Sequence, residues 1–475
     1  MLRKGEINST QIVEECFNNV QKFAHLNSFI STTDKQNLLS KAQSIDQKRK
    51  KGEAVGILNG LPIAIKDNFN VQGTLTSCAS KMLSNYISPY TATVCQKLID
   101  SDGLIIGKTN LDEFAMGSFT SNSHYGPTIN PYPSLLNDQS KDQYYPGGSS
   151  GGSAVAVATS QCYGALGSDT GGSVRLPASW CNIVGLKPSY GLCSRYGLVS
   201  YASSLDTPAI FTRTVEDSAL LLDIIAGYDP NDSTSIKNPA TRNYNKDIQE
   251  LSGVTVGIPL ECNVEELPEE IEDAWNEGIG FLKARGARVK FVSLPNMKYA
   301  LPAYYIIAPA EASSNLARYD GLRYGITTPT FENTREAFTK TREMGFGDEV
   351  KRRILVGTFV LSSSSYKDYF LQAAKVRSLV REDFSNAFKE VDVLLTPTST
   401  GLPPKLNSTH SQQNPLEEFL NDLMTIPASM AGVPAISVPM PISEKGIPVG
   451  LQLIANYLEE SKLLNIATVL QQINN

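Results

Sequence analysis

Two serines set between glycines mark residues 146–177, which read Pro146-Gly147-Gly148-Ser149-Ser150-Gly151-Gly152-Ser153, then an Ala/Val run, then Gly167-Ser168-Asp169-Thr170-Gly171-Gly172-Ser173-Val174-Arg175-Leu176-Pro177. Glycine beside a hydroxyl lets the backbone adopt positive φ and turn its N–H groups toward a ligand. The interval between Ser149 and Ser173 has room for one buried helix and a short strand, so the two serines can meet in space. The stretch therefore indicates an oxyanion hole or a phosphate cradle.

The glycines do not fit the common nucleotide-binding motifs. A phosphate-binding loop needs Lys-Ser/Thr after its last glycine, whereas Ser153-Ala154-Val155 follows here, and no Gly-x-Gly-x-x-Gly opens the helix. On these residues alone, an ordinary Gly/Ser loop remains an equal alternative, because such residues commonly punctuate loops.

Composition is typical of a globular protein and limits the classes of partner. The chain has 475 residues, of which 41% are hydrophobic and 19% charged, and its formal net charge is −6. An acidic surface repels polyanions, so nucleic acid would need a local patch or a partner subunit. The basic run Lys48–Lys51 is better interpreted as a solvated helix end.

Cysteine and histidine offer little for metal or triad chemistry. The seven cysteines are widely spaced without a Cys-x-x-Cys and are expected to be reduced core thiols. The three histidines, His25, His124 and His410, are isolated, so neither a zinc site nor a Ser-His-Asp triad is expected. A serine nucleophile in this chain needs another base.

Lys66 is the candidate for that base. The apolar run Leu61–Ile65 predicts a strand buried on both faces, and it ends in Lys66-Asp67-Asn68. Lys66 therefore leaves the core at the edge of the sheet where open α/β folds bind ligands. The alternative is a surface lysine paired with Asp67. Only a desolvated lysine has a pKa low enough to act as a neutral base.

Interleaved strand and helix patterns predict one α/β domain over residues 1–475. Helices are expected at 12–20 after a Ser9 cap, 92–98, 153–162, 271–284, 304–323, 350–381 and from Glu460. Strands are expected at 61–65, 103–107, 163–167, 254–258, 288–292, 391–396, 433–438 and 449–454. Residues 131–146 are expected to form a loop. No membrane span, signal peptide or long transit segment is visible.

Taken with Pro62–Asp67 and Gly185-Leu186-Lys187-Pro188, the glycine-serine strings resemble the amidase signature family. The resemblance implies a central mixed sheet covered by helices on both faces. It also implies a Ser-cisSer-Lys triad, in which Ser173 is the nucleophile, Ser149 the bridging serine after a cis peptide, and Lys66 the base. The oxyanion hole would consist of the backbone N–H groups of Thr170, Gly171, Gly172 and Ser173.

Three further stretches resemble the glutamine-hydrolysing branch of that family, whose members supply ammonia for converting Glu-tRNA(Gln) to Gln-tRNA(Gln). They are Gly107–Ser118, Glu311–Gly321 and Val350–Arg353-Ile354. The resemblance implies that Arg353 binds the glutamine α-carboxylate and Asp422 the α-ammonium, and that Tyr304 lines the pocket, a role that Tyr305 could also fill. Without the resemblance, Arg353 and Asp422 would be interpreted as solvated charges.

The resemblance also implies partners. No cofactor and no metal are expected in this chain, while ATP and Mg²⁺ are expected at a partner B-subunit that binds most of the tRNA. A small third subunit is expected as well, and no membrane. The long 131–146 loop and Leu205-Asp206-Thr207-Pro208 are similar to mitochondrial members, which predicts a mitochondrial protein, otherwise a cytoplasmic one.

Three alternatives stay open. The chain could be a stand-alone hydrolase of small or lipid amides, which predicts an apolar pocket without an Arg353/Asp422 pair. It could also be a catalytically silent scaffold. Cys78 could be the nucleophile, although no histidine is placed to activate it. Asp169 and Arg175 are expected to support the oxyanion loop.

Overall fold

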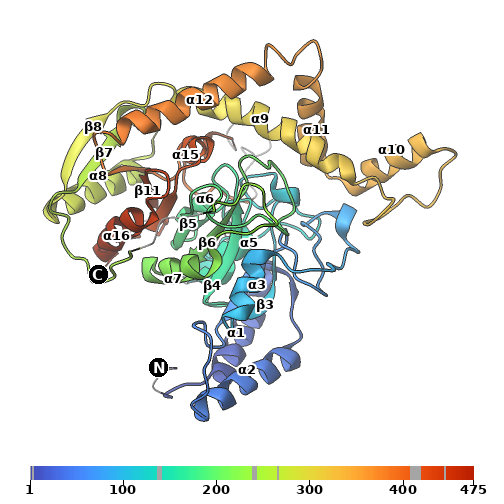
Figure 1. The fold of residues 1–475 in the computed structure, drawn as a ribbon, viewed down its shortest axis with the longest axis horizontal. Helices are drawn as coiled ribbons and strands as arrows, with labels where there is room; N and C mark the ends of the chain where they lie inside the picture. The colour runs from blue at the N-terminus through green and yellow to red at the C-terminus, as the bar shows by residue number, and fades with distance from the viewer. Residues whose placement is uncertain are drawn as a thin grey trace.

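One mixed sheet of eleven strands organises the chain. The computed structural model describes residues 2, 5–135, 142–237, 243–264, 267–406, 419–442 and 446–474. The strand order is β1-β3-β2-β4-β6-β5-β10-β11-β9-β7-β8 (Figure 1). The strands are β1 Phe29–Thr32, β2 Pro62–Lys66, β3 Leu104–Thr109, β4 Gly164–Asp169, β5 Val184–Lys187, β6 Thr207–Thr212, β7 Thr255–Pro259, β8 Arg288–Val292, β9 Val393–Pro397, β10 Ala435–Pro439 and β11 Gly450–Ala455.

Helices cover both faces of this sheet, as the resemblance implies. Successive residues of a strand point to opposite faces, and in β2 Ile63 and Ile65 join one hydrophobic cluster while Ala64 joins another. The first cluster includes side chains of α3 Thr93–Asp100, α7 Val215–Ile225 and α16 Glu460–Gln471. The second includes side chains of α1 Ser9–Lys22, α2 Lys35–Lys50 and α5 Gly151–Ala158. The central strands are thus buried on both sides.

Several predicted elements are confirmed. The β-α-β unit at 254–292 is β7, α8 Glu269–Ala284 and β8, with the two strands parallel. The predicted hairpin strands at 433–438 and 449–454 are β10 and β11, which pair antiparallel. The α1 helix is present, but Asn8 rather than Ser9 caps it, by accepting a hydrogen bond from the Gln11 backbone N–H.

Two predicted long helices are wrong in extent. The segment 350–381 is two helices, α11 Asp348–Val360 and α12 Phe370–Ala387, because serines interrupt it and Ser362 donates its hydroxyl to the Phe359 carbonyl. The helix predicted to reach Arg323 is α9 Ala300–Asn315, and Arg318 turns back to donate to the Asn315 carbonyl.

Other boundaries differ as well. Within the loop predicted at 131–146 the structure has a short helix, α4 Tyr132–Leu135, while residues 136–141, like His410, lie outside the described part of the chain. The helix predicted at 153–162 starts and ends earlier, as α5. The sequence patterns did not predict β5, β6, α6 Arg175–Trp180, α7, α10 Thr334–Gly345 and α15 Ile426–Ala431.

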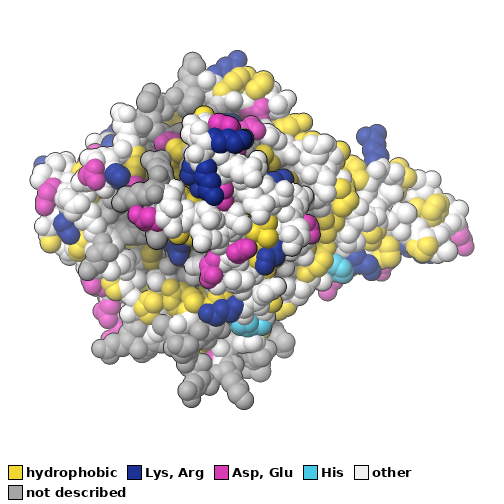
Figure 2. All heavy atoms as spheres, turned by 90° about the horizontal axis from the view of Figure 1, so that it is seen from below, with side chains coloured by type: hydrophobic (Ala, Val, Ile, Leu, Met, Phe, Trp, Pro, Cys, Tyr) yellow, Lys and Arg dark blue, Asp and Glu magenta, His cyan; other side chains and the backbone are white. Residues whose placement is uncertain are grey.

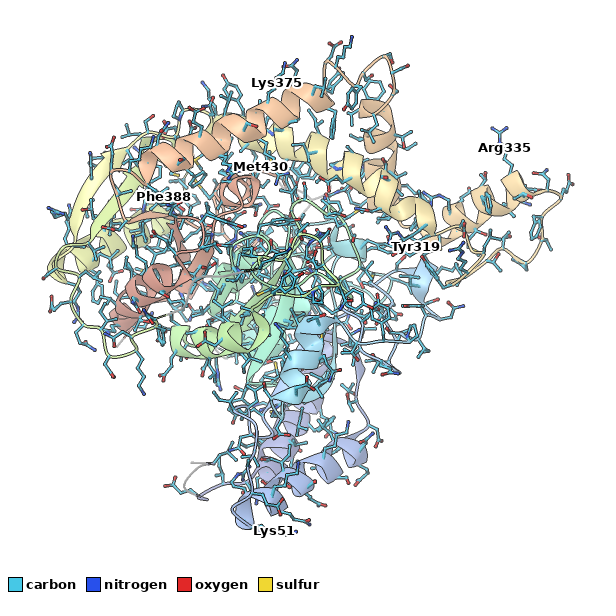
Figure 3. All side chains as sticks on the ribbon, in the orientation of Figure 1. Lys51, Tyr319, Arg335, Lys375, Phe388 and Met430 are labelled. Carbon is cyan, nitrogen blue, oxygen red and sulfur yellow. The ribbon has the colours of Figure 1, made fainter. Side chains whose placement is uncertain are left out.

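A helical layer formed by α9, α11, α12 and α15 lies over one end of the sheet, and α10 projects from it as an arm (Figure 1). Tyr319 lies where this arm leaves the body, and Arg335 on α10 points away from the rest of the molecule (Figure 3). In Figure 2, acidic and basic side chains are interspersed over the visible face rather than gathered in a patch of one sign. Among the described helices, none combines the length and apolar character that crossing a bilayer requires.

Candidate active site

Lys66 is fully buried at the carboxyl end of β2. Its Nζ donates to three hydroxyls, Ser149 Oγ at 2.8 Å, Ser150 Oγ at 2.7 Å and Ser168 Oγ at 2.9 Å. Burial lowers the pKa of Lys66 to about 7, while the carboxylates of Asp112, Asp169 and Asp206 act in the opposite direction. The amine is therefore close to the balance between charged and neutral forms at neutral pH.

The alternative in which Lys66 pairs with Asp67 at the surface is wrong. Asp67 is itself buried and forms an ion pair with Lys108, with 2.7 Å between Oδ1 and Nζ. Its other oxygen accepts from the Ser77 backbone N–H and hydroxyl. Successive residues of an extended chain point to opposite faces, so Lys66 and Asp67 take different partners.

Ser149 and Ser173 meet beside this amine. Ser149 lies just before α5, and the Gly148–Ser149 peptide bond is cis, as the resemblance implies. The backbone N–H of Ser150 donates to the Ser173 carbonyl at 3.2 Å, so the two serine segments are neighbours. Within the described residues, no hydrogen bond joins the two hydroxyls. Ser149 is fully buried and Ser173 is 8% exposed, so Ser173 is the more accessible of the two.

The predicted oxyanion loop connects β4 to α6, and its glycines have no room for a side chain. A Cβ on Gly171 would lie 2.9 Å from the Tyr304 hydroxyl, and a Cβ on Gly172 would lie 2.1 Å from Thr425 Oγ1. Thr170 donates its hydroxyl to Asp206 at 2.8 Å. Side chains from three distant segments therefore close around this loop.

Asp169 and Arg175 support the loop, as the sequence indicates. They form a fully buried, two-pronged ion pair, with 2.8 Å from Arg175 Nη2 to Asp169 Oδ1 and 3.0 Å from Nε to Oδ2. The remaining guanidinium donors reach the Thr425 carbonyl, Gln452 Oε1 and Ser429 Oγ. Arg175 thus joins the loop to α15 and β11, and each nitrogen of its guanidinium has an acceptor.

Arg353 is a buried residue of α11. It donates to Tyr201 Oη at 2.8 Å and to Glu349 Oε1 at 2.7 Å. Its guanidinium carbon lies 5.7 Å from the centre of the Tyr201 ring and 5.5 Å from that of Tyr305. The interpretation as a solvated helix charge is wrong, because the side chain is only 6% exposed.

Asp422 is also buried, and Ser118 donates its hydroxyl to Asp422 Oδ2 at 2.5 Å. Its Oδ1 lies 3.0 Å from the position of a Cβ on Gly172, which places the carboxyl group beside the oxyanion loop. Burial raises the pKa of Tyr304 well above its ordinary value, and the charges of both Arg353 and Asp422 act on that phenol. Tyr304 and Asp422 therefore lie beside Gly171 and Gly172, while Arg353 contacts Tyr201 and Tyr305.

The two adjacent tyrosines make different contacts. Tyr304 directs its hydroxyl end against Gly171 of the oxyanion loop, whereas Tyr305 packs on Arg353 and lies 4.4 Å, centre to centre, from the Phe419 ring. Tyr304 is therefore the tyrosine that lies beside the predicted oxyanion loop, and its role in lining the pocket stays a prediction.

Four side chains of this site were not predicted from the sequence. Ser150 and Ser168 contact the Lys66 amine directly, and both stand within the quoted strings, which is the signal that could have found them. Asp112 accepts three backbone N–H groups from Thr120 to Asn122. Asp206 holds Thr170, and burial raises the pKa of Asp206 to about 6. These two carboxylates also stand within stretches quoted for the resemblance, but their spacing alone does not indicate what they bind.

Cys78 does not compete with the serines. The thiol is fully buried, and desolvation raises its pKa well above the ordinary value, so it stays protonated. In the described part of the chain, no group of three or more His, Cys, Asp or Glu side chains is arranged to hold a metal ion.

A sequence model of the family described as Amidase matches residues 11–464. The chain belongs to the Amidase family. The glutamyl-tRNA(Gln) amidotransferase A-subunit of Trichodesmium erythraeum is 47% identical over 471 residues, covering 98% of this chain and 95% of that protein. The protein of the same name from Microcystis aeruginosa is 50% identical over 454 residues, covering 95% and 90% respectively.

Solved amidase structures share the fold over nearly the whole chain. The crystal structure of the glutamyl-tRNA(Gln) amidotransferase A-subunit from Thermotoga maritima has a TM-score of 0.78 and 37% identity, covering 99% of this chain and 95% of that one. Peptide amidase from Stenotrophomonas maltophilia has a TM-score of 0.81 at 27% identity, with 99% and 94% covered. Amidases that act on different classes of substrate thus share this architecture, so the fold alone does not determine the substrate and the residues that line the pocket must do so.

Proposed function

We propose that this chain is the glutamine-hydrolysing A-subunit of a glutamyl-tRNA(Gln) amidotransferase. The observation that carries the proposal is the Lys66 amine, which is removed from water and hydrogen-bonded to Ser149. Tyr304 and Asp422 lie against the neighbouring glycine loop, and buried Arg353 bonds to Tyr201. Relatives of that name that are 47% and 50% identical over nearly the full length support the same function.

In the proposed mechanism, Ser173 Oγ attacks the side-chain amide carbon of glutamine. Its proton passes through the Ser149 hydroxyl to the neutral Lys66 amine, because a serine hydroxyl is a weak nucleophile until a neighbour takes its proton. The same proton then reaches the leaving nitrogen, so ammonia departs and a γ-glutamyl ester remains on Ser173. Water, activated by the same relay, releases glutamate and restores the hydroxyl.

The backbone N–H groups of Thr170, Gly171, Gly172 and Ser173 are proposed to stabilise the oxyanion that forms during both steps. Arg353 is proposed to bind the α-carboxylate, because a planar guanidinium donates to both carboxylate oxygens. Asp422 is proposed to bind the α-ammonium, and Tyr304 to line the pocket between them. A buried Arg/Asp pair is not expected in a hydrolase of lipid amides, which favours glutamine over that alternative.

We further propose that the ammonia passes to a partner B-subunit, which holds ATP, Mg²⁺ and most of the Glu-tRNA(Gln), with a small third subunit completing the assembly. The acidic net charge supports binding of the tRNA mainly by the partner. A mitochondrial location is proposed from the similarity of Leu205–Pro208 to mitochondrial members. The bacterial relatives do not bear on this location.

The proposal is tested by co-expressing the chain with a B-subunit to assay the conversion of Glu-tRNA(Gln). The wild-type complex should use either glutamine or ammonium as the nitrogen donor. The Ser173→Ala complex should lose the glutamine-driven reaction by at least about 10³-fold and retain the ammonium-driven one. Unchanged glutamine use by Ser173→Ala would leave only the scaffold alternative.

A further inference from the structure

A series of hydrogen bonds between buried residues connects the predicted α-carboxylate subsite to the oxyanion loop. Arg353 Nη1 donates to the Tyr201 hydroxyl at 2.8 Å, and the Tyr201 backbone N–H donates to Asp206 Oδ2 at 2.9 Å. Asp206 Oδ1 accepts the hydroxyl of Thr170 at 2.8 Å. All four residues, Arg353, Tyr201, Asp206 and Thr170, are buried.

Asp206 is the central residue of this series of hydrogen bonds. Its two oxygens accept hydrogen bonds from the Thr170 hydroxyl, the Tyr201 N–H and the Ala202 N–H, the last of which reaches both oxygens. In turn, the Asp206 N–H donates to the Ala202 carbonyl and closes a tight turn over residues 202–206. A carboxylate held by backbone donors on one side fixes the position of whatever bonds to it on the other.

A second route joins the same two places. The Tyr304 phenol lies close enough to that of Tyr201 to lower the Tyr201 pKa, and Tyr304 in turn packs against Gly171. The segment Tyr201–Asp206 therefore touches the oxyanion loop at Thr170 and, through Tyr304, at Gly171. Arg353 is bonded to the one residue that both routes share.

We propose that Asp206 is a positioning residue for the oxyanion loop, and that Tyr201 couples occupation of the Arg353 subsite to the placement of Thr170 and Gly171. This rests on the proposed function, and it adds how the enzyme distinguishes its substrate. When the α-carboxylate of glutamine binds Arg353, the backbone N–H groups of the oxyanion loop are held in the position that stabilises the transition state. Recognition of the distant carboxylate is then expressed in kcat rather than only in KM.

The test is a double-mutant cycle of Thr170→Val and Tyr201→Phe, with glutamate release from glutamine measured in the co-expressed complex. Each single variant should lower kcat about tenfold, which is less than the loss of a complete oxyanion donor. The double variant should be only about 10- to 30-fold slower than wild type, instead of about 100-fold, because both substitutions interrupt one connection. Thr170→Ser, which keeps the hydroxyl, should restore most of kcat.

Tyr305→Phe is the matched control, because the Tyr305 ring packs on Arg353 and on Tyr304 and the phenylalanine ring retains both contacts. Its effect should multiply with that of Thr170→Val. Thermal unfolding midpoints show whether each variant is folded. The coupling would be overturned if the effects of Thr170→Val and Tyr201→Phe on kcat multiplied in the double variant, or if Tyr201→Phe changed KM alone. The proposed function would still stand in either case, provided that the wild-type complex hydrolyses glutamine. A wild-type complex without glutamine hydrolysis would overturn both.

Discussion

At the scale of single residues, the described part of the chain contains two buried lysines, Lys66 and Lys187, whose charged form is disfavoured by burial. Burial lowers the pKa of both Lys66 and Lys187 to about 7. Lys66 faces three serine hydroxyls, whereas Lys187 donates only to the Pro188 carbonyl among the described residues. Burial thus lowers the pKa of both lysines to a similar value, and of the two only Lys66 donates to serine hydroxyls among the described residues. Substitutions of the two lysines can therefore be compared directly.

The pH dependence of glutamine hydrolysis should report the Lys66 amine. Only the neutral amine accepts a proton, and it is charged below a pKa of about 7. The rate kcat/KM should therefore rise about tenfold per pH unit below that value and level off above about pH 8. The measurement is glutamate release across a pH range that spans this pKa on both sides. A flat profile, or a midpoint near the pKa of a solvated lysine, would contradict this assignment.

Lys187→Met is the control for that profile. The variant removes a buried amine of similar pKa that no hydroxyl accompanies among the described residues, so the midpoint at about 7 should persist in any folded Lys187→Met protein. Lys66→Met should instead lose hydrolysis by at least about 10³-fold, since removal of one member of a catalytic unit disables the unit.

Some residues of the candidate active site could be predicted from the sequence, and others could not. Lys66, Ser149 and Ser173 stand in glycine-flanked or strand-terminal positions whose local chemistry already indicates their use. Asp206 and Asp112 do not, because their partners are Thr170 and the backbone of residues 120–122, and only the fold brings such groups together. The contacts of a buried carboxylate are a tertiary property that no local pattern records.

At the scale of elements, α11 presents two adjacent arginines to different surroundings. Arg353 is 6% exposed and faces Tyr201, while Arg352 is 63% exposed, and both pair with Glu349. Helical periodicity alone predicts that neighbours point to different faces. Which of the two enters the core depends on α9, against which α11 packs.

Arg353→Met should raise KM for glutamine about 10- to 100-fold, since a charge-assisted contact of about 1.5–3 kcal/mol is removed. It should also lower kcat, because the coupling through Tyr201 is lost with it. Arg352→Met changes the same type of side chain one position away and should change KM less than about twofold, because exposed charges contribute little. Steady-state glutaminase kinetics on both variants make the comparison. Equal effects of the two substitutions would show that α11 acts as a charged surface rather than through one buried clamp.

The position of the α6 helix depends on the contacts of its first residue, Arg175. Arg175 is fully buried, and it ties the β4–α6 loop to α15 and β11. Arg175→Met leaves the Asp169 carboxylate buried without its partner and should reduce the free energy of unfolding by about 3–5 kcal/mol. Denaturant unfolding measures this, with the exposed ion pair Lys290–Glu390 as reference, where Lys290→Met should leave stability nearly unchanged. Similar losses for both variants would contradict the supporting role.

The element boundaries show why the remaining fold was harder to predict. Strands β2, β3, β7, β9, β10 and β11 were predictable because each is a short, largely apolar run, and β8 because polar and apolar residues alternate along it. Strands β5 and β6 were not: β6 contains Pro208, which argues against a central strand, and the structure nonetheless places it between β4 and β5. The serine-rich break after α11 follows from side chains that compete for backbone groups.

At the scale of the whole molecule, the net charge limits how tightly the isolated chain can bind nucleic acid. The net charge is −6, and on the face seen in Figure 2 both signs are mixed. Electrostatic attraction to phosphates supplies most of the nonspecific affinity for nucleic acid. That residues 1–475 make one domain stays a prediction, which a single cooperative unfolding transition would support.

The isolated chain should therefore bind Glu-tRNA(Gln) at least about 100-fold more weakly than its complex with the B-subunit does, when both are compared at the same salt concentration. Filter binding or fluorescence anisotropy with labelled tRNA provides the measurement. An isolated chain that binds as tightly as the complex would place the tRNA on this chain.

The measurement closest to the central claim identifies the covalent intermediate. Rapid acid quenching of the complex with glutamine, followed by peptide mass spectrometry, should find a γ-glutamyl ester on the peptide that contains Ser173. The ester should be absent in Ser173→Ala and should fail to accumulate in Lys66→Met. An ester or thioester on another residue, Cys78 included, or glutamine turnover by Ser173→Ala at the wild-type rate, would contradict the account.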